Sequence, residues 1–327
     1  MACPHTCMWQ TRMSLVGATL VVFGAFQRSE TKHMSQNQKP TRRAFLGAAG
    51  ALSAMSFPAI VLGQKNLREP VFRVAKAKLN PVRKPNEHAI EPALRYARDG
   101  LRYIQANIRD YQCTLVKQER VKGKLLPQEF IFCKVRNRKV KDGKVVVPFS
   151  IYMYFAKPRN ARGREVLYVE GRNKNKLIAH EGPNNLKGVL GSFWLNPKGA
   201  LAMAGQRYPI YEAGIENLVV KLIERGEKER KFADTQVQYR KGARINKREC
   251  TVIEVKHPVQ RPQHDYYKAR IFIDNSMNIP VRYAAYNWPR RKGGKLQLEE
   301  AYTYLNVKLN VGFTDNDFNH KNKNYRF

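Results

Sequence analysis

The stretch YQCTLVKQERVKGKLLPQEFIFCKVRNR, residues 111–138, shows the pattern on which the predicted fold depends. Two runs rich in β-branched and aromatic residues flank the segment KGKLLP, and this arrangement predicts a β-hairpin. Runs of the same kind, separated by short turns, continue along the chain. Because strands joined by short turns pair antiparallel, we predict one large antiparallel sheet. The further runs lie at residues 147–158, 163–171, 175–182, 243–258, 266–275, 279–289 and 295–309.

Two segments interrupt the strand pattern with helical periodicity. Apolar residues recur at spacings of three and four from Ile90 to Ile108, which predicts an amphipathic helix before the hairpin. Pro92 suits the first turn of that helix, where its missing N–H is not needed. A second helix is predicted after Pro209, and its apolar stripe consists of Ile215, Leu218, Val219, Leu222 and Ile223.

Some of the predicted strands are apolar on both faces. In PFSIYMYFA, residues 148–156, the odd-numbered side chains face one way, and Tyr152 and Tyr154 face the other. A sheet covered by helices on one side needs only one apolar face. The second face must therefore meet another layer, the sheet itself by curling, or a ligand. We expect a cavity lined in part by Ile151, Met153, Phe155 and Val166.

A glycine-rich segment, residues 182–206, carries several large apolar side chains, among them Phe193 and Trp194. One interpretation is a mobile flap over the cavity, in which case Phe193 and Trp194 belong to the cavity lining. The other is that the segment packs as part of the core.

Near the N-terminus, Arg42 and Arg43 precede 20 uncharged residues that are rich in Ala and Gly. This arrangement is typical of a twin-arginine signal peptide, and an uncleaved anchor helix is the alternative. Met34 suits the start of such a signal, so residues 1–33 are expected to be a spurious extension. The predicted organisation is therefore a signal at 34–63, a basic linker at 64–87 and a single domain at 88–327.

The charge of the chain is strongly positive, with a formal net charge of +34 at pH 7. Without the first 63 residues, 54 basic and 25 acidic residues remain, a net charge near +29. Such a surface favours an anionic neighbour, either lipid head groups, with peripheral contact to a membrane, or an acidic envelope polymer. Export to the periplasm or cell envelope makes nucleic acid an unexpected partner. A solvated basic surface without a specific partner is the alternative.

The sequence shows no catalytic motif. No two histidines have HExxH spacing, no cysteines have CxxC spacing, and there is no GxSxG, phosphate loop or dinucleotide fingerprint. We therefore predict no metal, no cofactor and no enzymatic activity. Asp315 and Asp317 resemble half of a calcium loop, but a helix N-cap at Thr314 or Asp315 explains this stretch better.

Three cysteines follow the signal: Cys113, Cys133 and Cys250. A two-residue turn at Lys122–Gly123 sets Cys113 opposite Phe132. Pro127 favours a bulge in the second arm, and one extra residue there moves Cys113 opposite Cys133. The two sulfurs are then neighbours and could form a disulfide, with Cys250 reduced. Alternatively, all three are small buried hydrophobic side chains.

Several motifs in order resemble the bacterial domain-of-unknown-function family 1571. They are YQCTLVKQERVKGKL, GREVLYVEGRNKNKLIAHEG, RYPIYEAGIENLVVKLIE, ARIFIDNSMNIPVRYAAYNWP and YTYLNVKLNVGFTDNDF. The resemblance covers roughly residues 88–319. That family is in turn distantly similar to the LolA/LolB-like periplasmic lipoprotein carriers. The resemblance implies an α+β fold in which a curved antiparallel sheet, an incomplete barrel, carries helices on its concave face around an apolar cavity.

Three functions remain open at this point. The first is an exported, non-enzymatic binding protein that carries an apolar ligand such as lipid or the acyl chain of a lipoprotein. The second is a basic protein of the envelope surface that binds anionic lipid or polysaccharide. The third is a hydrolase whose active site is assembled from residues far apart in the sequence.

Overall fold

A computed structural model describes residues 67, 75–76, 82–184, 191–291 and 293–327. These residues all belong to one compact unit, residues 54–327. The predicted spurious extension, Arg42 and Arg43 lie outside the described residues, as does the whole of the predicted signal.

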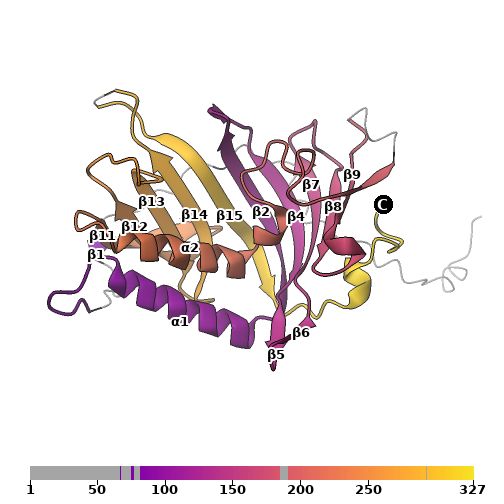
Figure 1. The fold of residues 1–327 in the computed structure, drawn as a ribbon, viewed down its shortest axis with the longest axis horizontal. Helices are drawn as coiled ribbons and strands as arrows, with labels where there is room; N and C mark the ends of the chain where they lie inside the picture. The colour runs from indigo at the N-terminus through magenta and orange to yellow at the C-terminus, as the bar shows by residue number, and fades with distance from the viewer. Residues whose placement is uncertain (1–66, 68–74, 77–81, 185–190, 292) are drawn as a thin grey trace, which may run out of the picture. The chain divides into compact units, whose positions relative to one another are not determined.

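The described part of the chain forms the predicted antiparallel sheet, with 13 strands (Figure 1). Its order is β1-β11-β12-β13-β14-β15-β2-β4-β7-β8-β9-β10, with β3 paired to β2. The outermost strands, β1 and β10, do not pair with each other, so the barrel is incomplete, as predicted. The strands are β1 (Ala75–Lys76), β2 (Asp110–Val121), β3 (Lys124–Leu125), β4 (Glu129–Arg136), β7 (Ser150–Lys157), β8 (Glu165–Val169), β9 (Leu177–His180), β10 (Ser192–Leu195), β11 (Gln236–Ile245), β12 (Arg248–Lys256), β13 (Lys268–Asp274), β14 (Ile279–Asn287) and β15 (Gln297–Leu309).

Four short strands differ from the sequence-based expectation. Ala75–Lys76 pairs with β11 as an edge strand, although it lies in the segment predicted to be a linker. A separate hairpin, β5 (Lys139–Lys141) and β6 (Lys144–Val147), forms between two predicted strand runs, where no strand was predicted. In the predicted flap, Ser192–Leu195 adds to the sheet as β10, while Leu186, Val189 and Leu190 lie outside the described residues.

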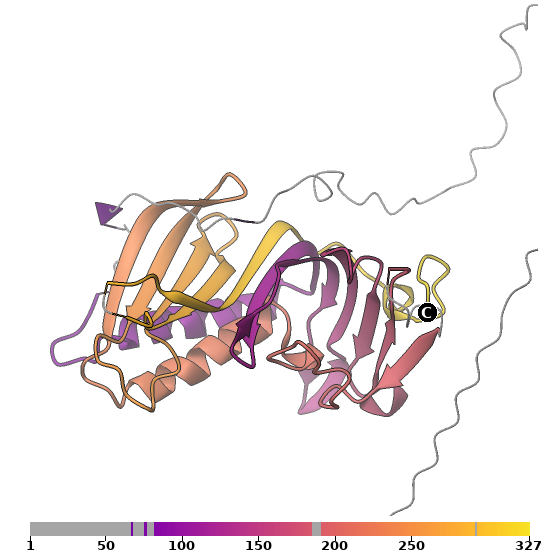
Figure 2. The same cartoon turned by 90° about the horizontal axis from the view of Figure 1, so that it is seen from above.

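Both predicted helices form and lie against one face of the sheet (Figures 1 and 2). The first, α1, covers Glu91–Asn107 with Pro92 in its first turn, and the second, α2, covers Ile215–Glu229. Their apolar stripes face inward, because Leu94 and Ile104 of α1 and Val219 of α2 are all buried. Neither helix is long and apolar enough to cross a membrane, and no other helix among the described residues is.

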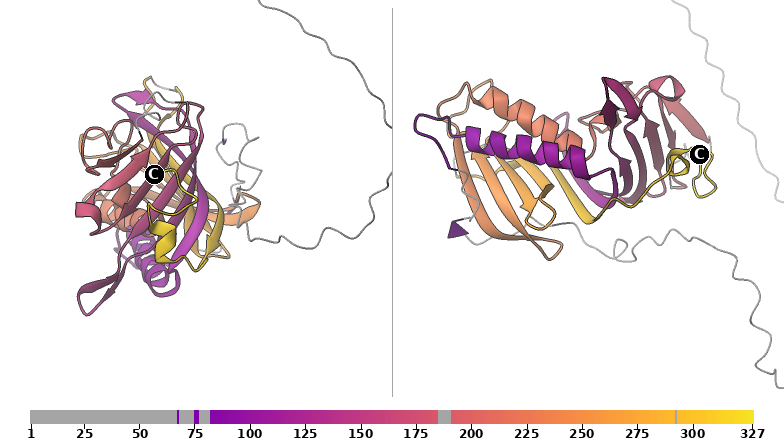
Figure 3. Two further views of the ribbon diagram at one scale, coloured as in Figure 1. Left: turned by 90° about the vertical axis from the view of Figure 1, so that its right-hand side faces the viewer. Right: turned by 90° about the horizontal axis from the view of Figure 1, so that it is seen from below.

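The opposite face of β7 and β8 is covered by the C-terminal segment, which lies beside these strands (Figure 3). The ring of Tyr152 stacks on that of Tyr325 with 4.0 Å between centroids, and Phe318 packs into the same cluster. The second apolar face of the strand 148–156 therefore meets another layer of protein. Phe318 ends a 3-10 turn, η5 (Asp315–Phe318), and Thr314 closes its capping box, so the N-cap prediction is confirmed.

The hairpin register contains the one-residue offset inferred from Pro127. Val121 pairs with Lys124 near the turn, whereas Cys113 pairs with Cys133 further along the arms. The second arm therefore holds one extra residue, which brings the two cysteines directly opposite each other. In this structure all three described cysteines are buried and free, and no disulfide joins them.

Candidate ligand-binding cavity

A cavity of about 320 Å³ lies between the helix-covered face of the sheet, α2 and the segment 195–214. Its volume is at the lower end of the range for small-molecule sites, about 300–1,000 Å³. Side chains from eight neighbouring strands, β14 to β10 in the order of the sheet, and from α2 contribute to its walls. The cavity therefore extends along the sheet from β14 to the edge strand β10.

One side of the cavity is apolar. Met153 on β7 pairs with Val166 on β8, and Val166 pairs with Ala179 on β9, so the three side chains form a row across the sheet. Phe155 and Leu177 lie on the same face and complete this apolar wall. Because paired residues in neighbouring strands point to the same face, strand register alone assembles this wall.

The structure brings together three of the six residues predicted to line the cavity: Met153, Phe155 and Val166. Ile151 shares their face but lies deeper, 1% exposed, in the hydrophobic core. Phe193 and Trp194 do not line the cavity. Phe193 sits opposite Ala179 on the edge strand β10 and stays 38% exposed, while Trp194 points to the other face and contacts the ring of His320.

The other side of the cavity is polar, and its side chains come from β2 and β15. Glu119 and Glu300 pair directly across these strands, and both are buried. Two like charges in this position repel each other. Tyr302 lies between them and donates its hydroxyl hydrogen to Glu119, with Glu300 a second acceptor at 3.2 Å. Lys117 adds a positive charge, 3.7 Å from Glu119.

Arg225 of α2 reaches the same polar wall from the opposite side of the cavity. Its Nη1 lies 2.8 Å from Oε1 of Glu300, and its Nη2 donates to the hydroxyl of Tyr208 at 2.6 Å. Arg225 also donates to the hydroxyl of Tyr283. The helix is therefore tied to the sheet through a buried arginine–carboxylate pair with several additional hydrogen bonds.

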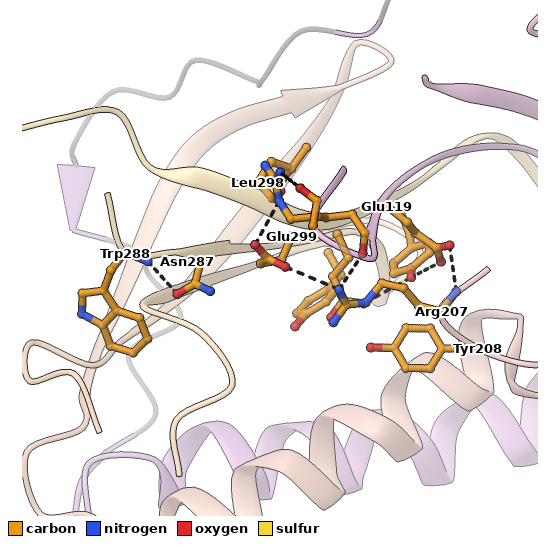
Figure 4. A network of polar contacts seen from close by, with 12 residues as sticks. Glu119, Arg207, Tyr208, Asn287, Trp288, Leu298 and Glu299 are labelled. Atoms are coloured by element: carbon orange, nitrogen blue, oxygen red, sulfur yellow. Dashed lines mark hydrogen bonds and ion pairs between the residues drawn. The ribbon is translucent and has the colours of Figure 1, made fainter. Parts of the chain in front are cut away.

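Arg207 extends this network toward the edge of the cavity (Figure 4). Its backbone N–H donates to Glu119 at 3.1 Å, and its guanidinium lies 3.5 Å from both Glu299 and Glu300. Arg120 pairs with Glu299 at 3.1 Å from the strand alongside. Every carboxylate of the polar wall thus has a cationic partner.

Burial changes the acidity of the groups that face the cavity. Burial, and then the charges of Glu300 and Glu119, raise the pKa of Tyr302 well above its ordinary value. Burial and the charge of Glu300 also raise the pKa of Tyr208. Burial lowers the pKa of Lys117, but Glu129 and Glu119 outweigh it, and the net pKa is raised. At neutral pH the tyrosines are therefore hydrogen-bond donors and the lysine is charged.

The lining offers little for covalent catalysis. No Ser, Thr, Cys, His or Asp contributes to it among the described residues. All four glutamates of the lining are held in ion pairs: Glu119 with Lys117, Glu181 with Arg164, Glu212 with Lys221 and Glu300 with Arg225. One group of described residues, Glu229, His257 and His264, has donor atoms close enough together to hold a metal ion, and none of the three lines the cavity.

The polar wall was not predicted from the sequence. Glu119 and Glu300 stand 181 positions apart by number and are ordinary surface residues by type. A weak signal existed in the alternation of side chains along β2, since Lys117 and Glu119 continue the inward-facing row of Tyr111 and Leu115. Without knowledge that β15 pairs with β2, this alternation could not be assigned to a cavity.

Comparisons with known proteins agree with the expected family. A family model described as "Protein of unknown function (DUF1571)" matches residues 108–327. A search of curated proteins found no significant relative. Similar solved structures include a DUF1329 family protein from Desulfovibrio piger, with 12% identity, a TM-score of 0.33 and coverage of 71% of this chain and 98% of the other. A LolA superfamily protein from Nitrosomonas europaea has 12% identity, a TM-score of 0.28 and coverage of 68% and 97%.

Proposed function

This chain belongs to the protein family of unknown function DUF1571, and we propose that it is a non-enzymatic protein that binds an apolar or amphiphilic ligand. Lipid and the acyl chain of a lipoprotein are the ligands of this class that we favour. The observation that carries the proposal is the cavity of about 320 Å³. Its wall on β7–β9 is apolar, and its wall on β2 and β15 holds hydrogen-bond donors.

The driving force for such a ligand is removal of its apolar surface from water. Each buried CH₂ group contributes about 0.8 kcal/mol. Two fewer methylene groups therefore cost about 1.6 kcal/mol, which is roughly a tenfold weaker Kd. Dependence of affinity on chain length is thus the expected signature of binding in the apolar part of the cavity.

The polar wall suits the hydrophilic end of the same ligand. The tyrosine hydroxyls of Tyr208 and Tyr302 keep their protons, and the guanidinium of Arg225 lies beside them. Because the charges of this wall are already paired, a neutral or zwitterionic head group fits it better than an additional free charge does. We therefore favour an amphiphile whose chain lies against Met153 and Val166.

The experiment is binding of fluorescent monoacylglycerols, which have a neutral head group, of increasing chain length to the purified protein, with native mass spectrometry for lipid retained during purification. Ala179→Trp places a large side chain in the apolar wall and is expected to weaken binding at least tenfold. Val311→Trp, at a position that is 43% exposed and not part of the lining, is the matched control. No uptake by the wild-type protein, or equal binding by both variants, would contradict the proposal.

We also propose that the protein is exported through the twin-arginine pathway to the periplasm or cell envelope. Arg42 and Arg43, followed by 20 uncharged residues, support this. Combined replacement, Arg42→Lys with Arg43→Lys, is expected to leave the precursor in the cytoplasm. Normal processing of that double variant would show that the segment is not such a signal.

A second candidate function, contact with an anionic lipid surface, is favoured by the β5–β6 hairpin. Val140, Val145 and Val146 are each at least half exposed there, and Lys139, Lys141 and Lys144 alternate with them. Apolar side chains among lysines are typical of shallow insertion into anionic membranes. Val145→Asp is expected to reduce sedimentation with phosphatidylglycerol vesicles at low salt. Sedimentation that does not depend on this substitution or on salt would contradict this function.

A further inference from the structure

Two histidines and a glutamate meet in the interior at the end of α2, outside the cavity. Glu229 is the last residue of α2, His257 follows β12, and His264 lies in the connection to β13. One potential ligand atom from each of the three residues lies within 4.8 Å of the other two. The cluster therefore joins the end of a helix to the connection between two strands.

All three side chains are buried, and some of their polar atoms lack a hydrogen-bond partner. His257 is 0% exposed, Glu229 6% and His264 7%. Nε2 of His257 faces Oε2 of Glu229 at 2.6 Å, and neither ring nitrogen of His264 makes a hydrogen bond. Leaving a buried polar atom without a partner is costly, and native structures rarely do so. Two unpartnered ring nitrogens beside a close nitrogen–carboxylate pair indicate that something absent from the polypeptide completes the cluster.

The hydrogen bond made by Nδ1 of His257 determines which ring nitrogen carries the hydrogen. Nδ1 lies 2.9 Å from the backbone carbonyl oxygen of Tyr266, which can only accept, so Nδ1 carries the hydrogen. In the neutral ring Nε2 then presents a lone pair, 2.6 Å from Oε2 of Glu229. A lone pair and a carboxylate oxygen at this distance repel each other unless a proton or a cation lies with them. This arrangement, with the carbonyl orienting the ring, is common for histidine ligands of metals.

His264 lies beside His257, and packing fixes the orientation of its ring. The rings of His257 and His264 stack with 4.1 Å between centroids, and the ring of Phe232 packs edge-on against His264 at 4.6 Å. Nδ1 of His264 lies 3.8 Å from the same glutamate oxygen. Packing on both sides fixes the orientation of this ring, although neither of its nitrogens is used by the protein.

The surrounding field favours a positive ion. Glu229 lies at the C-terminal end of α2, where the helix dipole is negative. Asp234 lies close enough for its charge to act on both imidazole rings, and Arg261, 3.7 Å from Oδ2 of Asp234, offsets part of that charge. Two imidazoles with one carboxylate form a ligand set that zinc accepts in proteins.

We propose that Glu229, His257 and His264 bind one divalent transition-metal ion, with zinc as the expected metal. The ion ties the C-terminal end of α2 to the β12–β13 connection, and because its ligands are buried its role is structural. The seven-residue separation of the histidines, with Glu229 far upstream, matches no sequence motif. The site is independent of the cavity and of any ligand bound there.

The test is zinc binding by the complete protein after removal of metals with a chelator. We expect one zinc per chain after dialysis, measured by mass spectrometry of the elements, and a rise in Tm on addition of zinc. Cobalt in place of zinc should give visible absorption bands typical of nitrogen and oxygen ligands. His264→Ala is expected to weaken binding by more than the 10- to 100-fold typical of outer-shell changes and to abolish the Tm response.

His320→Ala is the matched control, because His320 lies against Trp194 and outside the cluster. It should bind zinc like the wild-type protein. Circular dichroism checks that His264→Ala is folded. If this variant does not fold, the number of zinc ions bound per wild-type chain tests the proposal by itself. A wild-type protein without stoichiometric zinc, or with a doubly protonated His257 ring by ¹⁵N NMR in the presence of zinc, would overturn the proposal.

Discussion

Replacing Arg225 with methionine tests whether α2 is anchored to the sheet by a buried charge. Arg225 is 22% exposed at its side chain and Glu300 only 3%, and they lie 2.8 Å apart. Removing the arginine leaves Glu300 buried with a weaker set of partners, Arg207 at 3.5 Å and Tyr302 at 3.2 Å. Breaking a buried pair by removing one partner costs about 3–5 kcal/mol.

The expected loss lies at the lower end of that range. Arg225 keeps some contact with solvent, and Arg207 still offsets part of the charge of Glu300. We therefore expect Arg225→Met to lower the free energy of unfolding by about 3 kcal/mol. At about 2–4 °C per kcal/mol for a domain of this size, Tm should fall by roughly 6–12 °C.

The assay is urea denaturation of the purified protein, followed by a double-mutant cycle. The double variant, Arg225→Met with Glu300→Gln, removes both charges. Its loss of unfolding free energy should be at least about 1 kcal/mol smaller than the summed losses of the two single variants. Arg230→Met, at the exposed end of the same helix, is the control and should change stability by less than about 1 kcal/mol. A loss below about 1 kcal/mol for Arg225→Met, or strict additivity in the cycle, would refute the anchoring role.

Three further outcomes are expected from individual features of the fold. A Cβ at Gly226 of α2 would meet Cδ2 of Leu94 at 2.5 Å. Gly226→Ala is therefore expected to destabilise the protein by about 1 kcal/mol in urea denaturation, because overpacking outweighs the gain in helix propensity. A stabilised variant would contradict the contact between the helices. Burial opposes ionisation of Asp274, but its bonds from Arg248, Met277 and Ser276 outweigh this and lower its pKa from 3.8 to about 2. The contribution of Asp274 to stability is therefore present above pH 4 and lost as the pH falls toward 2. The free energy of unfolding of Asp274→Asn should fall less than that of the wild-type protein over this interval. An equal fall in both proteins would contradict the lowered pKa of Asp274. If the protein is exported, Cys113 and Cys133 are predicted to bridge, and thiol titration of denatured, unreduced protein should give one free thiol per chain, whereas three would show that the pair stays reduced.

The sequence by itself determined the local elements of this fold. The spacing of Ile90, Leu94 and Ile104 specifies α1, and alternation along 147–158 specifies β7, because each pattern is set by the geometry of one short segment. It also determined the offset between Cys113 and Cys133, since a hairpin register depends only on its turn and on one extra residue. Family motifs in order then gave the antiparallel sheet with helices on one face.

Only the tertiary structure decided which side chains meet. The pairing of β15 with β2 places Glu300 opposite Glu119, and the approach of α2 places Arg225 between them and Tyr208. The same is true of Glu229, His257 and His264, whose types are common and whose spacing is irregular. Nothing in a local pattern specifies contacts between segments far apart in the chain, because they depend on strand order and helix docking. The cavity and the buried histidine cluster are therefore consequences of packing that periodicity alone does not encode.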